Sequence, residues 1–246
     1  MTMPQLSLSV QQLCGQDQSH VVAIPAENGL LHPSTVSAYL EMRAAAKSQG
    51  IILAIASGFR SFERQLSIWN RKWSGALMLR DQSGRELDVT ALTDDEKLAA
   101  ILHWSALPGS SRHHWGTDLD VYDPTEFTNT DRQLQLVPSE YCDPQGPCFS
   151  LWQWLTEHAS EFGFFFPYAR YQGGVAQEPW HLSYRPLSCR LLPQLTPAVL
   201  KQIIASTDIA GQSAILASID QIHQQYIDNI CEDNGWTNTW CGYSSF

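Results

Sequence analysis

The chain has 246 residues, of which 43% are hydrophobic, and this is enough for one sizeable buried core. Its 25 acidic residues outnumber 15 basic ones, and the formal net charge of −10 argues against nucleic acid or an anionic membrane as a partner. No apolar run approaches the roughly 18 residues needed to span a membrane. Residues 1–21 also lack the apolar segment of a secretory signal, so we expect a cytoplasmic protein if Met1 is the natural start.

Apolar periodicity, capping residues and glycine stops predict the elements in chain order. Helices are expected at 34–49 (capped by Ser34), 62–73, 93–105 (opened by a Thr93–Glu96 capping box), 150–162, from 196 onward, and 212–229. Strands are expected at 51–56, as a buried apolar run, and at 117–122, where polar and apolar residues alternate; 164–171 is an aromatic-rich strand or loop. Residues 74–92 show little periodicity, which indicates a surface excursion or a lid.

Helices grouped around a small sheet indicate an α+β protein. The chemical motifs described next span too much of the chain to belong to two independent halves. We therefore expect a single catalytic domain over 1–246, with its core at about 34–186 and a C-terminal helical extension, 187–246, packed on that core.

Two separated segments carry residues that suit a metal. Residues 111–120 read Ser-Arg-His-His-Trp-Gly-Thr-Asp-Leu-Asp, and His181 follows 61 residues after Asp120. The glycine at 116 permits a tight turn, so that His113 from a loop and Asp120 from a strand can converge on one ion. Two imidazoles and a carboxylate form a three-ligand set typical of a catalytic zinc that keeps a fourth position open for water.

A second carboxylate, Glu178, lies three residues before His181, where it could handle the proton of that water. A regular strand would place these two side chains on opposite faces. Pro179 favours an irregular entry into the strand, so we expect Glu178 to come from a loop and His181 from the strand itself.

Three elements together carry a family resemblance. They are Ser-x-His-x-x-Gly-x-x-x-Asp at 111–120, Glu-x-Trp-His at 178–181, and Ser-Gly-Phe-Arg-Ser at 57–61 with Gln65 after it. In order and spacing they resemble the zinc D-alanyl-D-alanine carboxypeptidase family, which includes VanY-type D,D-carboxypeptidases and L,D-carboxypeptidases. The resemblance covers roughly residues 34–186, and the tail beyond it carries none of these motifs.

The resemblance implies a fold and a set of roles. The fold would be the hedgehog/D,D-peptidase fold, whose small, mostly antiparallel sheet carries the zinc. The residues implied to bind one Zn2+ per chain are His113, Asp120 and His181, with Glu178 as general base. Those implied to hold the terminal carboxylate of the substrate are Arg60, Gln65 and Ser111, since a guanidinium can bind a carboxylate through two hydrogen bonds.

Asp118 departs from the family pattern, which usually has a small residue at this position. It would share one face of the strand with Asp120. We expect this extra acid either to orient a metal ligand or to meet a positive group on the substrate.

The implied substrate is a peptidoglycan stem peptide or muropeptide. The leading hypothesis is an L,D-carboxypeptidase that removes the terminal D-alanine from stem tetrapeptides during cell-wall recycling, because recycled tetrapeptides enter the cytosol. The alternative is a D,D-carboxypeptidase or D,D-dipeptidase of the VanY/VanX kind. A non-catalytic zinc-binding module is a third hypothesis, and Glu178 argues against it, because such a module needs no base beside its metal.

The six cysteines are thinly spread, and in a reducing compartment free thiols are the simplest expectation. Two alternatives remain open, because turn-forming residues separate Cys142 from Cys148 and Cys231 from Cys241. Either pair could form a disulfide.

Overall fold

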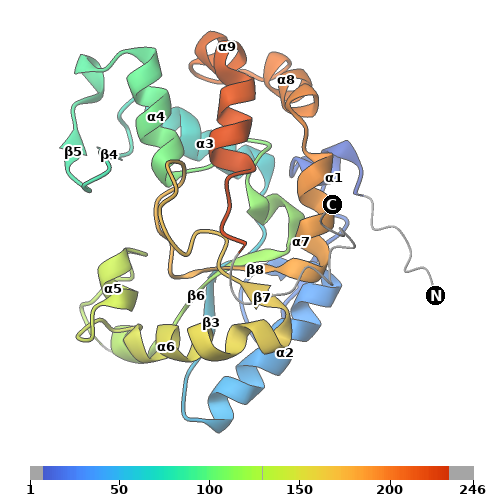
Figure 1. The fold of residues 1–246 in the computed structure, drawn as a ribbon, viewed down its shortest axis with the longest axis vertical. Helices are drawn as coiled ribbons and strands as arrows, with labels where there is room; N and C mark the ends of the chain where they lie inside the picture. Colours follow the sequence, from blue (N-terminus) through green and yellow to red (C-terminus); the bar gives the residue numbers. More distant parts are fainter. Residues whose placement is uncertain (1–7, 129, 233–246) are drawn as a thin grey trace.

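A computed structural model describes residues 8–128 and 130–232 of the chain. At its centre lies an antiparallel sheet of four short strands (Figure 1). In spatial order the strands are β3 (Ala54–Ser57), β6 (Asp118–Tyr122), β8 (His181–Tyr184) and β7 (Phe164–Phe165). The two middle strands, β6 and β8, are paired on both sides and almost wholly buried, so side chains on them are held rigidly.

Helices cover the sheet from two sides, as Figure 1 shows. The α-helices are α1 (Val10–Leu13), α2 (Pro33–Ser48), α3 (Phe62–Trp73), α4 (Asp94–Trp104), α5 (Pro138–Cys142), α6 (Phe149–His158), α7 (Arg185–Leu191), α8 (Pro197–Ala205) and α9 (Gln212–Ile222). Helices α2 and α6 share one hydrophobic cluster with the sheet. Helices α3, α4, α8 and α9 share a second cluster on the other side, so the C-terminal helices pack directly against helices that precede the metal motif.

Shorter elements complete the described part of the chain. Two small hairpins are formed by β1 (Val22–Ala23) with β2 (Leu30–Leu31) and by β4 (Leu79–Arg80) with β5 (Glu86–Leu87). Short 3-10 turns lie at Val89–Ala91, η2 (Arg112–Trp115), Thr125–Phe127, Ala159–Phe162 and Leu192–Gln194, and a π-helical turn, η6 (His223–Ile227), follows α9. The α+β class and the small antiparallel sheet expected from the sequence are confirmed.

Local chemistry explains where the predicted helices begin. Helix α3 matches its predicted range, and Ser61 caps it by accepting a hydrogen bond from the Arg64 N–H at 3.2 Å. Helix α4 opens with the predicted Thr93–Glu96 capping box. The cap predicted for α2 at Ser34 is wrong: the helix begins at Pro33 and His32 caps it, because proline suits the first helical position.

Other boundaries were predicted less well. The strand expected at 51–56 pairs only over Ala54–Ser57, and it is half-buried because β3 is an edge strand bonded to β6 alone. The helices expected at 150–162 and 212–229 each lose α-helical geometry early and end in the 3-10 turn Ala159–Phe162 and in η6. The 74–92 segment contains the β4–β5 hairpin, and Phe164–Phe165 is the strand in 164–171.

Both members of the Cys142–Cys148 pair are free thiols, so the alternative of a disulfide there is wrong. Cys148 is fully buried in a small cluster with Tyr141 and Trp180, while Cys142 is only partly buried beside it. Cys241 lies outside the described residues, and its pairing with Cys231 stays a prediction.

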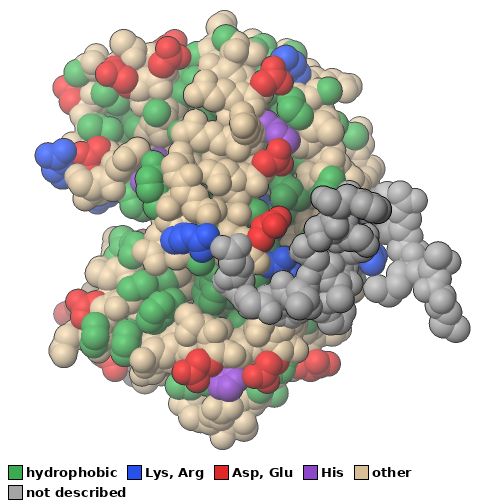
Figure 2. All heavy atoms as spheres, in the orientation of Figure 1, with side chains coloured by type: hydrophobic (Ala, Val, Ile, Leu, Met, Phe, Trp, Pro, Cys, Tyr) green, Lys and Arg blue, Asp and Glu red, His purple; other side chains and the backbone are tan. Residues whose placement is uncertain are grey.

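The surface agrees with the acidic composition. Figure 2 shows Asp and Glu side chains on both the upper and lower parts of one face, with few Lys and Arg among them. Within residues 8–128 and 130–232, no helix has the length and apolar character needed to cross a membrane.

Candidate active site

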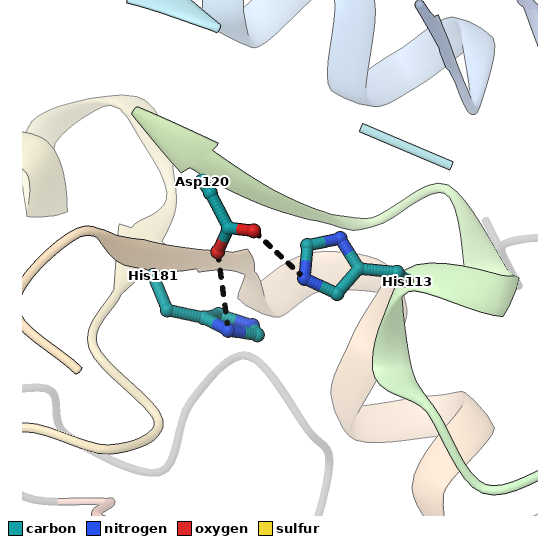
Figure 3. Close-up of side chains that lie close together, drawn as sticks. All are labelled: His113, Asp120 and His181. Atoms are coloured by element: carbon teal, nitrogen blue, oxygen red, sulfur yellow. Dashed lines mark ion pairs between the residues drawn. The ribbon is translucent and has the colours of Figure 1, made fainter. Parts of the chain in front are cut away.

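The sheet register brings the three predicted metal ligands together (Figure 3). Asp120 on β6 lies directly opposite His181 on β8, so both side chains leave the sheet on the same side. His113 enters from η2. His113 Nε2 lies 3.5 Å from Asp120 Oδ2 and His181 Nδ1 lies 3.6 Å from Asp120 Oδ1, with all three residues about 4% exposed. One donor atom from each residue falls within 4.8 Å of the others, which is close enough to share an ion.

Gly116 makes this convergence possible. It ends η2 with a φ of 67°, a left-handed conformation that favours glycine. A Cβ at this position would lie 2.5 Å from Val21 Cγ1 and 2.7 Å from the His32 backbone nitrogen. No larger residue fits this turn without moving the chain, so the turn that carries His113 requires a glycine.

The donor set suits zinc. Two imidazole nitrogens and one carboxylate match the three-ligand sets of catalytic zinc sites, whereas Ca²⁺ and Mg²⁺ favour sites made of oxygen alone. The outer nitrogen of His113, Nδ1, lies 2.9 Å from the Gly58 carbonyl oxygen, which can only accept a hydrogen bond. The proton therefore sits on Nδ1, and Nε2 presents its lone pair to the centre of the cluster.

Glu178 comes from the loop before β8, as the sequence predicted. Its backbone N–H donates to the Tyr168 carbonyl at 2.9 Å, and its own carbonyl accepts from the His181 N–H at 3.1 Å. This turn brings Glu178 Oε2 to 3.0 Å from His181 Nδ1. The carboxylate thus lines the cleft beside the ligands, within reach of a water held there.

The carboxylates around His181 determine its protonation in the metal-free protein. Burial alone would lower the pKa of His181, but hydrogen bonds to Asp118 and Glu178, with the charge of Asp120, raise it to about 10. A proton therefore occupies the position that a metal would take, and metal binding must displace it.

Arg60 stands at the edge of the metal cluster. It lies between β3 and α3, and its backbone N–H donates to the His113 carbonyl at 3.2 Å. Its Nη2 lies 3.8 Å from Asp120 Oδ2 and donates to Ser57 Oγ at 3.3 Å. The side chain is 20% exposed and lines the cleft, so its guanidinium can still reach a ligand.

Gln65 lies behind Arg60 and does not line the cleft. It is fully buried, and its Oε1 accepts from Arg60 Nη1 at 3.1 Å while its Nε2 donates to the Ala106 carbonyl at 2.7 Å. Each end of the amide makes a hydrogen bond within the protein, so the structure places Gln65 in contact with Arg60 and outside the lining of the cleft. Its position is that of a residue that holds Arg60.

Ser111, in contrast, lines the cleft at the start of η2. Its side chain makes no capping hydrogen bond, so the hydroxyl can meet a substrate group.

Asp118 is fully buried and does not line the cleft. It accepts hydrogen bonds from Arg112 Nε at 2.7 Å and Thr117 Oγ1 at 2.6 Å, and it lies 3.0 Å from His181 Nε2. Burial would raise the pKa of Asp118, but the charge of Arg112 and the bonds from His181 and Thr117 hold it well below its usual range. Of the two roles that we expected, direct contact with the substrate does not fit this burial.

Sequence reasoning missed several residues around the cleft. Tyr168 stands edge-on to His181, with ring centroids 5.1 Å apart. Lys72 donates to Ser105 Oγ at 2.6 Å where Ser105 lines the cleft, and burial lowers the pKa of Lys72 to about 8. Ile68 lines the cleft, and Lys72 follows it by four residues. This spacing puts both side chains on one face of α3, and it could have indicated from the sequence that Lys72 lies near the cleft.

The C-terminal helices also contribute to the cleft, which encloses about 270 Å³. Three residues that follow the recognised motifs in the sequence line it from α9 and η6: Ile222, Tyr226 and Ile227. The segment is tied to the loop that carries Glu178, because Gln225 Nε2 donates to the Gly173 carbonyl at 2.7 Å. The cleft is therefore polar at the metal and apolar away from it.

Comparison with known proteins identifies the family. The family model for the VanY D-alanyl-D-alanine carboxypeptidases matches residues 28–187. The chain belongs to this family. It is a zinc-dependent peptide hydrolase of the carboxypeptidase class, with the His-Asp-His cluster as its candidate metal site.

Individual relatives and one solved structure are similar to parts of the chain. A Haemophilus influenzae protein described as uncharacterised is 36% identical over 123 residues, covering 49% of this chain and 92% of its own length. An Enterococcus faecalis D-alanyl-D-alanine carboxypeptidase is 28% identical over 153 residues, which cover 61% of this chain and 46% of that protein. The solved structure of the LdcB LD-carboxypeptidase matches with a TM-score of 0.50 at 20% identity, covering 85% of this chain and 79% of that one, and so shows the shared fold.

Proposed function

We propose that this member of the family removes the terminal D-alanine from peptidoglycan stem peptides, and that its preferred substrate is the tetrapeptide. The observation that carries the proposal is Arg60, a cation that lines the cleft beside the proposed ligand Asp120. A guanidinium at this position can bind the free carboxylate at the end of a peptide. An enzyme that recognises the terminal carboxylate of its substrate in this way is an exopeptidase.

Each step of the proposed hydrolysis can be given to a residue of the cleft. Zinc, when held by His113, Asp120 and His181, supplies Lewis-acid polarisation of the scissile carbonyl and lowers the pKa of the attacking water. Glu178 Oε2 accepts the proton of that water and returns it to the departing amine of D-alanine. Arg60 and Ser111 hold the terminal carboxylate, and Gln65 keeps the Arg60 guanidinium in place.

The shape of the cleft supports the tetrapeptide. In an L,D-substrate the residue before the scissile bond has a long aliphatic side chain, whereas in a D,D-substrate it is D-alanine with a single methyl. The apolar part of the cleft, lined by Leu102, Ile222 and Tyr226, offers a surface for such methylene groups. A pentapeptide end would leave that surface uncovered.

Three further parts of the proposal concern context. Soluble recycled tetrapeptides suit a cleft of this small volume, so we propose a role in cell-wall recycling in the cytoplasm. We also propose that the chain acts as one catalytic domain, because α8 and α9 share a hydrophobic cluster with α3 and α4. D,D-cleavage is the second candidate, favoured by the carboxypeptidase name of the family and of the Enterococcus faecalis relative.

The test compares two substrates under identical conditions. Purified, zinc-loaded protein is incubated with a stem tetrapeptide and with the matching pentapeptide, and the products are weighed by mass spectrometry. We expect loss of one D-alanine from the tetrapeptide, at a higher kcat/KM than any cleavage of the pentapeptide. Preferential cleavage of the pentapeptide would establish the D,D-activity instead. Zinc-loaded protein that cleaves neither peptide would indicate a zinc-binding module.

A further inference from the structure

We propose that Asp118, fixed in turn by Arg112, positions the His181 ring so that its Nδ1 faces the zinc. The inference rests on the ligand set assigned under the proposed function.

The two nitrogens of His181 face different surroundings. Nδ1 lies in the cleft, 3.0 Å from Glu178 Oε2 and 3.6 Å from Asp120 Oδ1, whereas Nε2 lies 3.0 Å from Asp118 Oδ1, which does not line the cleft. A carboxylate can only accept, so Nε2 donates its hydrogen there. Once the metal displaces the proton on Nδ1, the lone pair of that nitrogen can bind it, while Nε2 keeps its own proton and its hydrogen bond sets the rotation of the ring.

Arg112 leaves the Asp118 carboxylate no freedom to rotate. Its Nε donates to Oδ1 at 2.7 Å, and Thr117 Oγ1 donates to Oδ2 at 2.6 Å, so both oxygens are engaged. The guanidinium is itself fixed, because Nη2 donates to Ser183 Oγ at 2.5 Å and the group lies 4.9 Å from the Trp115 ring. Asp118 is consequently held outside the metal cluster, and it can serve the metal only through His181.

The other imidazole is held in a different way. The outer nitrogen of His113 meets the Gly58 backbone carbonyl, which no substitution can remove. His181 depends instead on a side chain, and mutation can therefore separate the positioning of this ligand from the ligand itself. Partners of this kind typically change metal affinity by about 10- to 100-fold.

Zinc affinity, measured by competition with a chromophoric chelator at fixed pH, provides the test without any peptide substrate. Asp118→Ala should bind zinc about 10- to 100-fold more weakly than wild type. Asp118→Asn should retain most of the affinity, because its Oδ1 can still accept from His181 and its amide nitrogen can donate to Thr117. The control is Asp123→Ala, which removes the same charge just beyond β6, where the Asp123 carboxylate accepts from the Thr125 N–H. This variant should bind zinc as wild type does.

Asp118→Ala could misfold, since it leaves the Arg112 guanidinium buried without its counter-ion. The double variant Arg112→Met with Asp118→Ala removes the pair as a unit, and its thermal unfolding in the metal-free state shows whether it is folded. If this folded double variant, or Asp118→Ala itself, binds zinc as tightly as wild type, the proposal is overturned. An Asp118→Asn variant as weak as Asp118→Ala also overturns it.

The zinc-affinity measurements test the role of Asp118 separately from the proposed peptidase reaction. If wild-type protein cleaves no stem peptide but the affinities follow the expected order, the proposed function fails and the positioning role stands. If His181→Ala retains full zinc affinity, the ligand assignment on which the inference rests is wrong.

Discussion

Arg60 offers the sharpest prediction about how the enzyme recognises a chain end. If its guanidinium binds the terminal carboxylate, Arg60→Ala leaves that carboxylate unpaired in a partly desolvated cleft. Losing one partner of such a pair costs about 2–5 kcal/mol. Arg60 keeps some contact with water, and Asp120 at 3.8 Å already offsets part of its charge, so the low end applies. We expect a loss of about 2–3 kcal/mol, or roughly 30- to 140-fold in kcat/KM.

The assay measures release of D-alanine from two peptides, one with a free C-terminus and one with a C-terminal amide. Amidation should impair the wild-type enzyme severely and the Arg60→Ala variant little, because the partner of the carboxylate is already absent. Arg60→Lys should recover only part of the activity, since one ammonium cannot reproduce two parallel hydrogen bonds. Arg64→Ala, at an exposed position on α3 four residues after Arg60, is the matched control and should behave as wild type.

Two outcomes would refute the reasoning. If amidation costs both enzymes equally, Arg60 does not read the chain end, and Ser111 or Lys72 becomes the leading candidate. If amidation costs neither enzyme, the protein cleaves internal bonds and is not a carboxypeptidase. Zinc content must be measured alongside, because Arg60 also neighbours Asp120, a proposed metal ligand.

Three further predictions concern the metal, the support of Arg60 and the effect of pH. His113→Ala and His181→Ala should each lose zinc and activity together, as elemental analysis would show, because three protein ligands leave none to spare; stoichiometric zinc in both variants would contradict the assignment. Gln65→Met should raise KM more than it lowers kcat and should leave zinc content unchanged, since Gln65 holds Arg60 without touching the metal; a variant with wild-type KM would show that Arg60 needs no such support. In the metal-free protein the pKa of His181 is raised to about 10, whereas histidine in an unfolded chain has a pKa of about 6.5. The protonated ring therefore favours the folded state, and metal-free protein should lose stability as the pH rises from about 6.5 towards about 10. Thermal unfolding over this window should change more for the metal-free wild type than for metal-free His181→Ala, and equal changes would refute the role of His181.

The central features of the site were predictable because they depend on short-range rules. The spacing of His113, Gly116 and Asp120 defines a turn followed by a strand, and the structure has both. Pro179 indicated the irregular entry that lets Glu178 and His181 face one cluster. These inferences need only backbone geometry and the chemistry of metal ligands.

The remaining features depend on packing between distant parts of the chain. The position of Gln65 behind Arg60 follows from its bond to the Ala106 carbonyl, 41 residues away. Asp118 could be recognised as unusual from the sequence, but its burial against Arg112 depends on how η2 folds back on β6. The apolar wall from Ile222 and Tyr226 exists only because α9 packs over the cleft, and no local pattern in the tail indicates that.

The zinc dependence of activity in wild type and in Glu178→Gln tests the central claim most directly. Metal-free protein is titrated with zinc, and bound metal and D-alanine release are measured in the same samples. We predict that activity rises to a plateau at one zinc per chain in wild type. Glu178→Gln should bind the same amount of zinc but lose a factor of about 10² to 10⁴ in kcat, the usual contribution of a positioned base. A Glu178→Gln enzyme within about tenfold of wild type, or full wild-type activity without zinc, would contradict the account of a zinc hydrolase with Glu178 as its base.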